Sequence, residues 1–255
     1  MKRLLLFDLD GTLTKSRQAV DEEMSSLLVE LLHKTKVAVI SGGPIEQFHK
    51  QLVNRLGCDD VRLLESLYLF PTCATSFYRY KEDRWLNVYS EKLSDEEVKG
   101  IKSAINYAVH WTNTFPETEQ IWGEQIENRG TQVTFSALGQ NAPLEMKSKW
   151  DADQSKRKKI KKVLEKIIPE FEVRLGGNTS IDVTKKGIDK TYAIQQIDKH
   201  LGIKKRDMVF IGDALYEGGN DSPMLNTGIP CVSVKDEEET KVLMRRFLNG
   251  ESIGN

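Results

Sequence analysis

Short apolar runs recur along this chain, and each predicts a buried β-strand. The first runs are Leu4–Phe7, Val37–Ile40 and Met208–Ile211. Between the first two, residues 18–34 carry apolar side chains at helical spacing, and residues 45–56 repeat this pattern after the second run. Strands alternating with helices predict a parallel sheet with right-handed crossovers, which is the doubly wound form of the α/β fold class.

The pattern changes from about residue 76, where predicted hairpins mix with predicted helices. The elements expected there are a hairpin over 77–85, helices over 94–109 and 156–168, and strands over 132–136, 171–175 and 180–183. The doubly wound pattern returns at about residue 188 and ends with a strand at 229–234 and a helix at 237–248. We therefore expect a core domain of residues 1–80 and 188–255, interrupted by an α+β module of residues 81–187.

Composition narrows the classes of function. Lys plus Arg (37) nearly balance Asp plus Glu (38), so the charge favours neither nucleic acid nor an anionic membrane as a partner. The apolar runs are much shorter than the roughly 20 residues that span a bilayer, and Asp8 and Asp10 interrupt the first one. Three scattered cysteines predict reduced thiols in a cytoplasmic protein. The basic cluster at 156–162 is expected to be a solvated helix face.

Carboxylates follow two of the predicted strands. Asp8 and Asp10 come at the end of the first run, and Asp213 and Asp221 follow the run that ends at Ile211. Because the carboxyl ends of parallel strands meet at one edge of a sheet, these side chains are expected to gather there. Such a group suits a hard cation such as Mg²⁺, and one carboxylate can also act as a nucleophile.

Four signals stand in a fixed order along the chain: Asp8-Leu9-Asp10-Gly11-Thr12-Leu13, Ser41 after an apolar strand, Lys190 at the start of a helix, and Gly212-Asp213 with Gly219-Asn220-Asp221. This order resembles the haloacid dehalogenase superfamily of phosphotransferases. The resemblance implies a Rossmann-like core with an inserted cap, the C2-type cap of that superfamily, and metal-dependent phosphoryl transfer.

The resemblance also implies roles for the core residues. Asp8 would attack phosphorus and become an aspartyl-phosphate, and Asp10 would act as general acid and then as base. Asp8, Asp10 through its backbone carbonyl, and Asp213 would hold Mg²⁺, with Asn220 and Asp221 in the remaining metal positions. Ser41, helped by Gly42, would bind the phosphoryl oxygens, and Lys190 would pair with Asp8.

The local sequence also allows purely structural roles for three of these residues. Asp10 fits a turn, Ser41 fits a helix N-cap, and Lys190 fits a surface lysine.

Further segments resemble the phosphomannomutases of the eukaryotic type. These are the opening through Arg17, Arg129-Gly130-Thr131-Gln132, Gly176-Gly177-Asn178 with Ser180 and Asp182, and Gly187-Ile188-Asp189-Lys190. The resemblance implies a substrate that is a sugar phosphate. Its hydroxyls or phosphate would meet Arg17, Arg129, Lys147, Asn178, Ser180 and Asp182. A homodimer through the cap is also implied, for which the aromatic stretch Phe77 to Trp85 is a candidate.

One segment departs from the family pattern. Where that family has an arginine in an SPxGR segment, this chain has Ser136-Ala137-Leu138-Gly139-Gln140. Lys147 follows as a point charge rather than a guanidinium fork. A mutase must hold its bisphosphorylated intermediate, so a sugar-phosphate phosphatase with the same core stays an alternative. A non-catalytic sugar-phosphate-binding protein is a third hypothesis.

Overall fold

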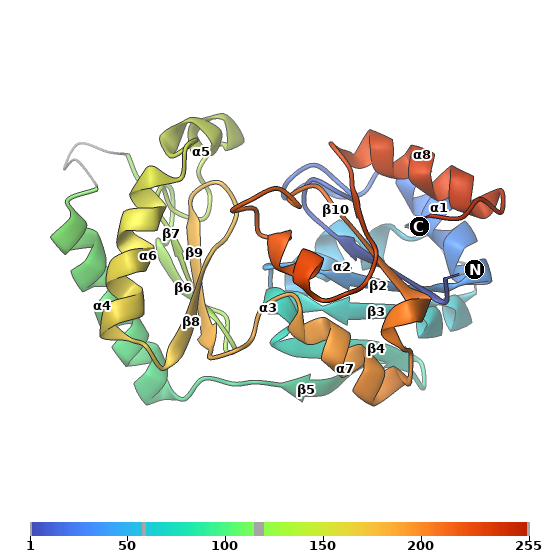
Figure 1. Ribbon diagram of the computed structural model, residues 1–255, viewed down its shortest axis with the longest axis horizontal. Helices are drawn as coiled ribbons and strands as arrows, with labels where there is room; N and C mark the ends of the chain where they lie inside the picture. The colour runs from blue at the N-terminus through green and yellow to red at the C-terminus, as the bar shows by residue number, and fades with distance from the viewer. Residues whose placement is uncertain (1, 58–59, 115–119, 254–255) are drawn as a thin grey trace. The chain divides into compact units, whose positions relative to one another are not determined.

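The computed structural model describes residues 2–57, 60–114 and 120–253 of the chain. The chain divides into two compact units (Figure 1). The first unit consists of Met1–Ser90 and Asp189–Asn255, and the second is Glu91–Ile188. Separate clusters of buried apolar side chains stabilise the two units, so each has a core of its own.

A mostly parallel sheet forms the centre of the first unit. In the described part of the chain it has seven strands, in the order β11-β10-β1-β2-β3-β4-β5. Their bounds are β1 (Leu4–Asp8), β2 (Lys36–Ile40), β3 (Leu67–Phe70), β4 (Ser76–Lys81), β5 (Arg84–Ser90), β10 (Met208–Gly212) and β11 (Cys231–Ser233). Phe7 of β1 lies opposite Ile211 of β10 and Val39 of β2, in parallel register. The strand ends that precede Asp10, Ser41 and Asp213 therefore lie side by side.

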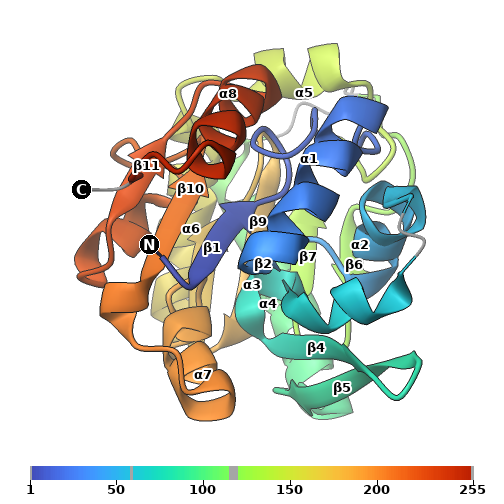
Figure 2. The ribbon, with the colours of Figure 1, turned by 90° about the vertical axis from the view of Figure 1, so that its right-hand side faces the viewer.

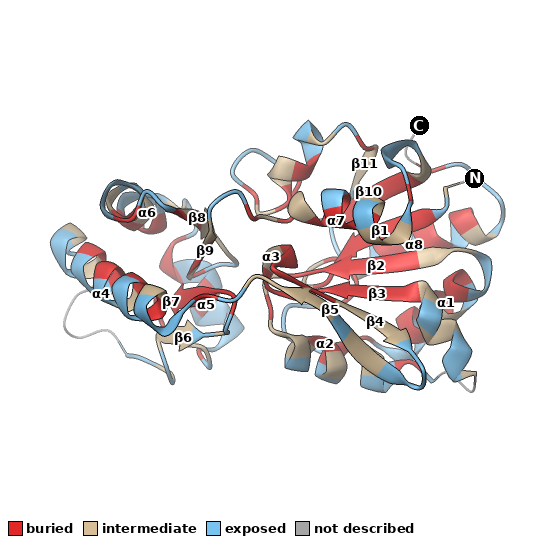
Figure 3. Cartoon of the chain, turned by 90° about the horizontal axis from the view of Figure 1, so that it is seen from below, coloured by how far each residue is buried: buried red, intermediate tan, exposed pale blue. Residues whose placement is uncertain are grey.

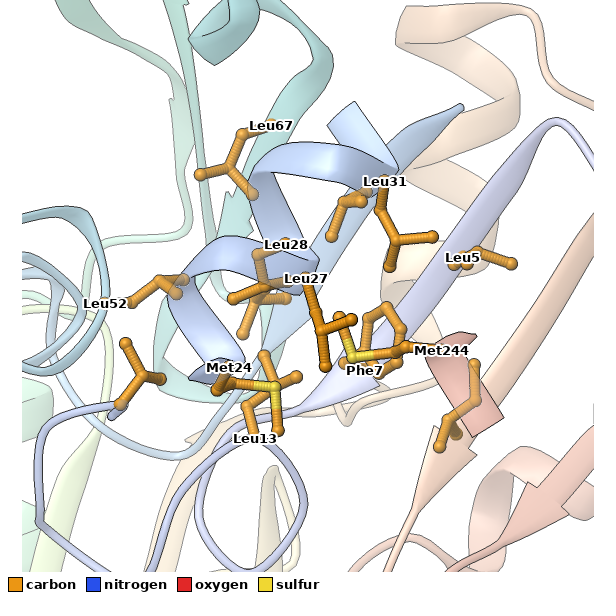
Figure 4. Close-up of a cluster of buried hydrophobic side chains, with 14 of the residues drawn as sticks. Leu5, Phe7, Leu13, Met24, Leu27, Leu28, Leu31, Leu52, Leu67 and Met244 are labelled. Carbon is orange, nitrogen blue, oxygen red and sulfur yellow. The ribbon is translucent and has the colours of Figure 1, made fainter. Parts of the chain in front are cut away.

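Helices cover both faces of this sheet (Figure 2). The helices are α1 (Glu22–Lys34), α2 (Ile45–Gln51), α3 (Pro71–Ala74), α7 (Tyr192–Leu201) and α8 (Glu237–Leu248), with 3₁₀ segments at Val53–Arg55, Val61–Ser66, Lys205–Asp207 and Ser222–Asn226. Because successive strand residues point to opposite faces, Leu5 and Phe7 pack with α1 and α8, as Figure 4 shows. Leu4 and Leu6 pack with α7 on the other face. The doubly wound α/β core predicted from the sequence is confirmed.

The first helix begins later than its apolar spacing predicts. Its N-cap is Asp21, whose Oδ1 accepts from the backbone N–H of Met24 at 2.8 Å, and residues 18–20 belong to the preceding loop. The backbone N–H of Val20 donates to the carbonyl oxygen of Gln51 at 2.8 Å. The end of α2 therefore anchors the loop that runs from β1 to α1.

The sheet of the first unit extends further along the chain than expected. The strand β3 was not predicted from the sequence, although Leu67–Phe70 is a short buried run of the expected kind. The hairpin expected to open the inserted module joins this sheet instead, because β4 pairs antiparallel with β3 and β5 with β4. The first unit therefore runs to Ser90 rather than to residue 80, and it includes the stretch Phe77 to Trp85.

The second unit contains an antiparallel sheet in the order β6-β7-β9-β8. Its elements are α4 (Asp95–Thr112), β6 (Ile126–Asn128), β7 (Val133–Ser136), α5 (Leu144–Trp150), α6 (Ser155–Ile167), β8 (Phe171–Leu175) and β9 (Ser180–Lys185). Apolar side chains of α4 and α6 pack against the strands, and Figure 3 shows the buried stripes of these helices. A capping box between Ser94 and Glu97 starts α4. The unit has the α+β composition expected of the inserted module.

Within the described residues, no helix is both long and apolar enough to cross a membrane. Cys73 and Cys231 are half-buried and form no disulfide among the described residues, and Cys58 lies outside those residues. On α6, Lys158 and Lys159 are exposed as expected, but Arg157 is only 3% exposed.

Candidate active site

Three carboxylates gather at the carboxyl edge of the parallel strands. Asp8 ends β1, Asp213 directly follows β10, and Asp221 directly precedes the 3₁₀ segment Ser222–Asn226. One oxygen of each lies within 4.8 Å of one oxygen of the others. Asp8 is 3% exposed and Asp221 is fully buried. We call Asp8, Asp213 and Asp221 the carboxylate group.

The ammonium of Lys190 joins two members of the carboxylate group. Its Nζ lies 2.6 Å from Oδ1 of Asp8 and 2.6 Å from Oδ1 of Asp221. Burial alone would lower the pKa of Lys190, but the charges of Asp221 and Asp8 outweigh burial and raise it. Lys190 is thus a buried, permanently charged partner of Asp8 rather than a surface lysine.

The electrostatics of the group favour a further cation. Three carboxylates facing one ammonium leave an excess of negative charge. Burial raises the pKa of Asp8 well above its usual value, and the nearby charges of Asp221 and Asp213 raise it further, although Lys190 opposes them. Burial and Asp221 likewise raise the pKa of Asp213. A divalent cation among these oxygens would relieve the repulsion, and hard oxygen donors suit such an ion.

Thr12 connects the loop after β1 to Asp213. Its Oγ1 donates to Oδ1 of Asp213 at 3.2 Å and accepts from the backbone N–H of Asp213 at 3.1 Å. Next to it, Gly11 has φ +90°, and a Cβ there would lie 2.6 Å from Oδ2 of Asp213. Both residues of the Gly11-Thr12 pair therefore shape the position of Asp213. Thr12 lies in the opening motif, but the sequence did not point to this role.

Asp10 does not join the carboxylate group through its side chain. Its Oδ1 accepts from the backbone N–H of Arg17 at 2.6 Å and from Nε2 of Gln51 at 3.2 Å. Its Oδ2 accepts from Nε2 of Gln47 at 3.0 Å. Asp10 is half-buried, and its carboxylate lies beside α2. Neither glutamine was among the residues expected at the site. Nothing in the sequence indicates which face of α2 meets the loop after β1.

The loop after β2 brings Ser41 and Gly42 to the same sheet edge. Ile40 lies opposite Asp8 in the parallel register, so the next residue, Ser41, follows beside the carboxylate group. Ser41 is 3% exposed, and its Oγ accepts from the backbone N–H of Gly43 at 3.2 Å. Gly42 is half-buried, and Arg17 is exposed with a left-handed φ of 60°. Asn220 is half-buried beside Asp221.

The residues expected to recognise the sugar phosphate in the second unit lie on and around its sheet. Asp182 of β9 is buried, and its Oδ1 accepts from Nε2 of Gln132 at 2.9 Å and from Oγ1 of Thr134 at 2.8 Å. Asn178 is exposed in the turn before β9, and Ser180 is half-buried at its start. These contacts hold the Asp182 carboxylate on the face of the sheet where Thr134 points.

Arg129 and Lys147, the two cations expected to meet the substrate in the second unit, each contact an acceptor of the same unit. The guanidinium of Arg129 pairs with Glu127 at 2.7 Å. The ammonium of Lys147 donates to the backbone carbonyl of Gln140 at 2.8 Å. Lys147 is thus hydrogen-bonded to Gln140, the residue that stands where the family has an arginine.

A buried ion pair supports the glycine turn that carries Asn178. Nε of Arg157 lies 2.7 Å from Oδ2 of Asp151, and the same guanidinium donates to the carbonyl oxygen of Gly177. Oδ1 of Asp151 also accepts from the backbone N–H of Lys156 at 2.8 Å, in the first turn of α6. The pair therefore connects the start of α6 to the Gly176-Gly177 turn.

Comparison with known proteins gives a consistent result. The family model described as eukaryotic phosphomannomutase matches residues 24–249. The phosphomannomutase of Encephalitozoon cuniculi is 27% identical over 249 residues, covering 94% of this chain and 91% of that protein. The phosphomannomutase of Saccharomyces cerevisiae is 29% identical over 223 residues, covering 86% and 83%.

Solved structures share the fold. An N-terminally truncated IMP-nucleotidase of Plasmodium falciparum superposes with a TM-score of 0.72 at 20% identity, covering 96% of this chain and 69% of that one. The C-terminal domain of a C. albicans trehalose-6-phosphate phosphatase gives a TM-score of 0.66 at 17% identity, covering 98% and 93%. The fold is that of the haloacid dehalogenase superfamily, as the sequence predicts.

Proposed function

We propose that this chain, which belongs to the eukaryotic phosphomannomutase family, moves a phosphoryl group between the 1- and 6-positions of mannose phosphate by way of Asp8. The observation that carries the proposal is the buried pairing of Asp8 with Lys190 at 2.6 Å. An ammonium at this distance holds the carboxylate in place and offers charge to the phosphoryl oxygens.

The transfer takes two steps at one phosphorus atom. First, an oxygen of Asp8 attacks the 1-phosphate of hexose 1,6-bisphosphate, the P–O bond to the sugar breaks, and Asp10 gives its proton to the leaving oxygen, which releases the hexose 6-phosphate. Second, the 6-hydroxyl of mannose 1-phosphate attacks the aspartyl-phosphate, the P–O bond to Asp8 breaks, and Asp10 takes the proton of that hydroxyl, which restores the bisphosphate. Asp10 therefore ends the cycle in the state in which it began.

We assign Mg²⁺ to the carboxylate group as the cofactor. Asp8, Asp213 and Asp221 would hold it with the backbone carbonyl of Asp10, and Asn220 would complete or orient its shell. When bound, the ion neutralises charge between Asp8 and the incoming phosphate.

Recognition of the remaining substrate groups is assigned by the family resemblance. Ser41 and Gly42 bind the phosphoryl oxygens, and Arg17 faces the sugar hydroxyls or a phosphate. In the second unit the assigned residues are Arg129, Lys147, Asn178, Ser180 and Asp182, for the sugar hydroxyls and the second phosphate.

The test follows both products of one substrate. The enzyme is incubated with mannose 1-phosphate, Mg²⁺ and a trace of hexose 1,6-bisphosphate, and mannose 6-phosphate and free phosphate are measured together. Mannose 6-phosphate is expected to dominate, and Asp8→Asn is expected to abolish both products. A matched control is Asp198→Asn, which removes an exposed carboxylate on α7 and should keep full turnover. Full turnover by Asp8→Asn would contradict the nucleophile assignment.

A sugar-phosphate phosphatase is the second candidate, and one observation favours it. Gln140 replaces the arginine that the family uses on the second phosphate, and Lys147 donates to its carbonyl oxygen. Weaker retention of the bisphosphate would let water accept the phosphoryl group. Free phosphate without mannose 6-phosphate in the same assay would establish this candidate.

We also infer a homodimer through the second unit. Tyr107 and Trp111 of α4 are 50% and 69% exposed, and their rings stack at 5.8 Å. Exposed aromatic side chains of this kind suit an interface between copies. The mass in solution tests this, and Trp111→Ser should convert a dimer to a monomer.

A further inference from the structure

Gln47 and Gln51 hold the two oxygens of the Asp10 carboxylate from one helix. We propose that these glutamines position Asp10 so that its catalytic proton is exchanged at Oδ2. The proposal rests on the assignment of Asp10 as acid and base of the proposed phosphoryl transfer, and it adds two positioning residues and the reacting atom.

The two amides share one face of α2. They lie four residues apart, which places them one above the other on a helix. Gln51 also fixes the loop that carries Asp10, because its Nε2 donates to the carbonyl oxygen of Gln18 at 2.6 Å. A Cβ at Gly43 would lie 2.2 Å from Oε1 of Gln47, so the glycine leaves space for that amide to reach Asp10.

The donors divide the two carboxylate oxygens into different roles. An ionised carboxylate offers about two acceptor sites on each oxygen. Both sites of Oδ1 are used, one by the backbone N–H of Arg17 and one by Gln51. Among the described residues Oδ2 accepts only from Gln47, which leaves one site for a proton. The proton that Asp10 gives and takes is therefore carried by Oδ2, beside the Gln47 contact.

The burial of Gln51 leaves one side of its amide unsatisfied, so stability alone does not account for a glutamine at this position. The residue is 2% exposed, and its Oε1 is buried with no hydrogen-bond partner among the described residues. An unsatisfied buried acceptor destabilises the fold, and an apolar side chain of similar length would avoid it. In such a variant the carbonyl oxygen of Gln18 would keep the hydroxyl of Thr14 as a donor at 3.1 Å. The part of Gln51 that makes contacts is thus its NH₂ group, which donates to Oδ1 of Asp10 at 3.2 Å and to the carbonyl oxygen of Gln18 at 2.6 Å.

The experiment separates acid catalysis from other effects by the leaving group. Single-turnover rates of Asp8 phosphorylation are measured for p-nitrophenyl phosphate, which needs no acid, and for alkyl phosphates, which need one. General acids contribute about 10²–10⁴-fold, so Asp10→Asn should lose about that much on alkyl phosphates and little on the aryl ester. Gln51→Met and Gln47→Met should each lose about 10–100-fold on alkyl phosphates only, as part of the same contribution.

Two controls exclude a merely structural role. Gln51→Met should unfold at the same temperature as the wild type or higher, while Gln196→Met, a buried glutamine of α7, should keep all rates. In the Asp10→Asn background neither glutamine substitution should lower the rates further. Equal losses on aryl and alkyl esters, further losses without Asp10, or unchanged rates would each overturn the proposal.

Failure of the proposed function gives a different result. A wild type that turns over aryl and alkyl phosphates but no hexose phosphate would contradict the mannose substrate, while the leaving-group comparison would still decide the role of the glutamines. A wild type that cleaves no phosphate ester at all would overturn both.

Discussion

Arg157 and Asp151 form an ion pair inside the second unit, with Nε and Oδ2 2.7 Å apart and side chains that are 4% and 0% exposed. The other basic residues of α6 are half-buried or exposed, so the pair stands out by its burial. It joins the start of α6 to the Gly177 carbonyl oxygen. The turn that contains Asn178 is therefore hydrogen-bonded to a buried ion pair.

Arg157→Met should destabilise the second unit strongly. Removing one partner leaves Asp151 buried without its charge partner, which costs about 3–5 kcal/mol. Urea unfolding checks this, and Lys158→Met on the exposed face of the same helix should stay within about 0.5 kcal/mol of the wild type. An Arg157→Met protein as stable as the Lys158→Met protein would contradict the role of the pair.

Thr12→Val should weaken cation binding while the protein stays folded. The hydroxyl orients Asp213 through two hydrogen bonds, and loss of such outer contacts typically costs about 10–100-fold in metal affinity. Titration with Mg²⁺, followed by calorimetry or by activity, measures the change. Thr240→Val removes another fully buried hydroxyl of the first unit and should leave the affinity unaltered.

Asp21→Asn should destabilise the protein at neutral pH, and the effect should disappear in acid. Its partial burial opposes ionisation, but hydrogen bonds from Lys241 and from the Met24 N–H lower the pKa of Asp21 below its ordinary value of 3.8. A lowered carboxyl pKa contributes stability that is present above 3.8 and is lost as the pH falls through the folded value.

Asp21→Asn should lower the free energy of unfolding at pH 7 by less than about 1 kcal/mol, because the Asp21 side of its ion pair with Lys241 is largely exposed. Asparagine retains the helix cap, so the substitution isolates the charge. Urea unfolding at pH 7 and at pH 3 tests the sign, and a difference that grows toward pH 3 would refute it.

Gln140→Arg should raise the ratio of mutase product to free phosphate. A guanidinium can hold a phosphate with two hydrogen bonds, whereas the amide of Gln140 carries no charge. The ratio of mannose 6-phosphate to phosphate from one substrate measures the effect. Gln140→Lys is the matched variant, with the same charge but no fork, and should raise the ratio less.

The expected gathering of Asp8 and Asp213 at one sheet edge is present in the structure, and the reason is local. Asp8 ends one apolar strand and Asp213 directly follows another, and neighbouring parallel strands bring such positions to one edge. Lys190 was reached only through the order of motifs, because nothing local distinguishes a buried lysine from a surface one.

Other features depend on tertiary contacts that no local pattern contains. Gln47 and Gln51 look like ordinary polar positions of an amphipathic helix, and only the returning loop gives them Asp10 as a partner. The β4–β5 hairpin has the same pattern whichever sheet it joins, so its place beside β3 could not be inferred. Arg157 stands among lysines of the same charge, and its burial follows from packing against Asp151.

The position of β1 between β2 and β10 has a consequence for synthesis of the chain. Its neighbour β2 is made soon after it, but Met208, opposite Leu4, is made only after the whole second unit. The second unit is one continuous stretch, so it can fold before residues 189 onward have been made. Lys190, Asp213 and Asp221 all come later, so a nascent or prematurely ended chain carries Asp8 without its partners. Phosphoryl-transfer chemistry therefore begins only after Asp221 has been made and β10 has paired with β1.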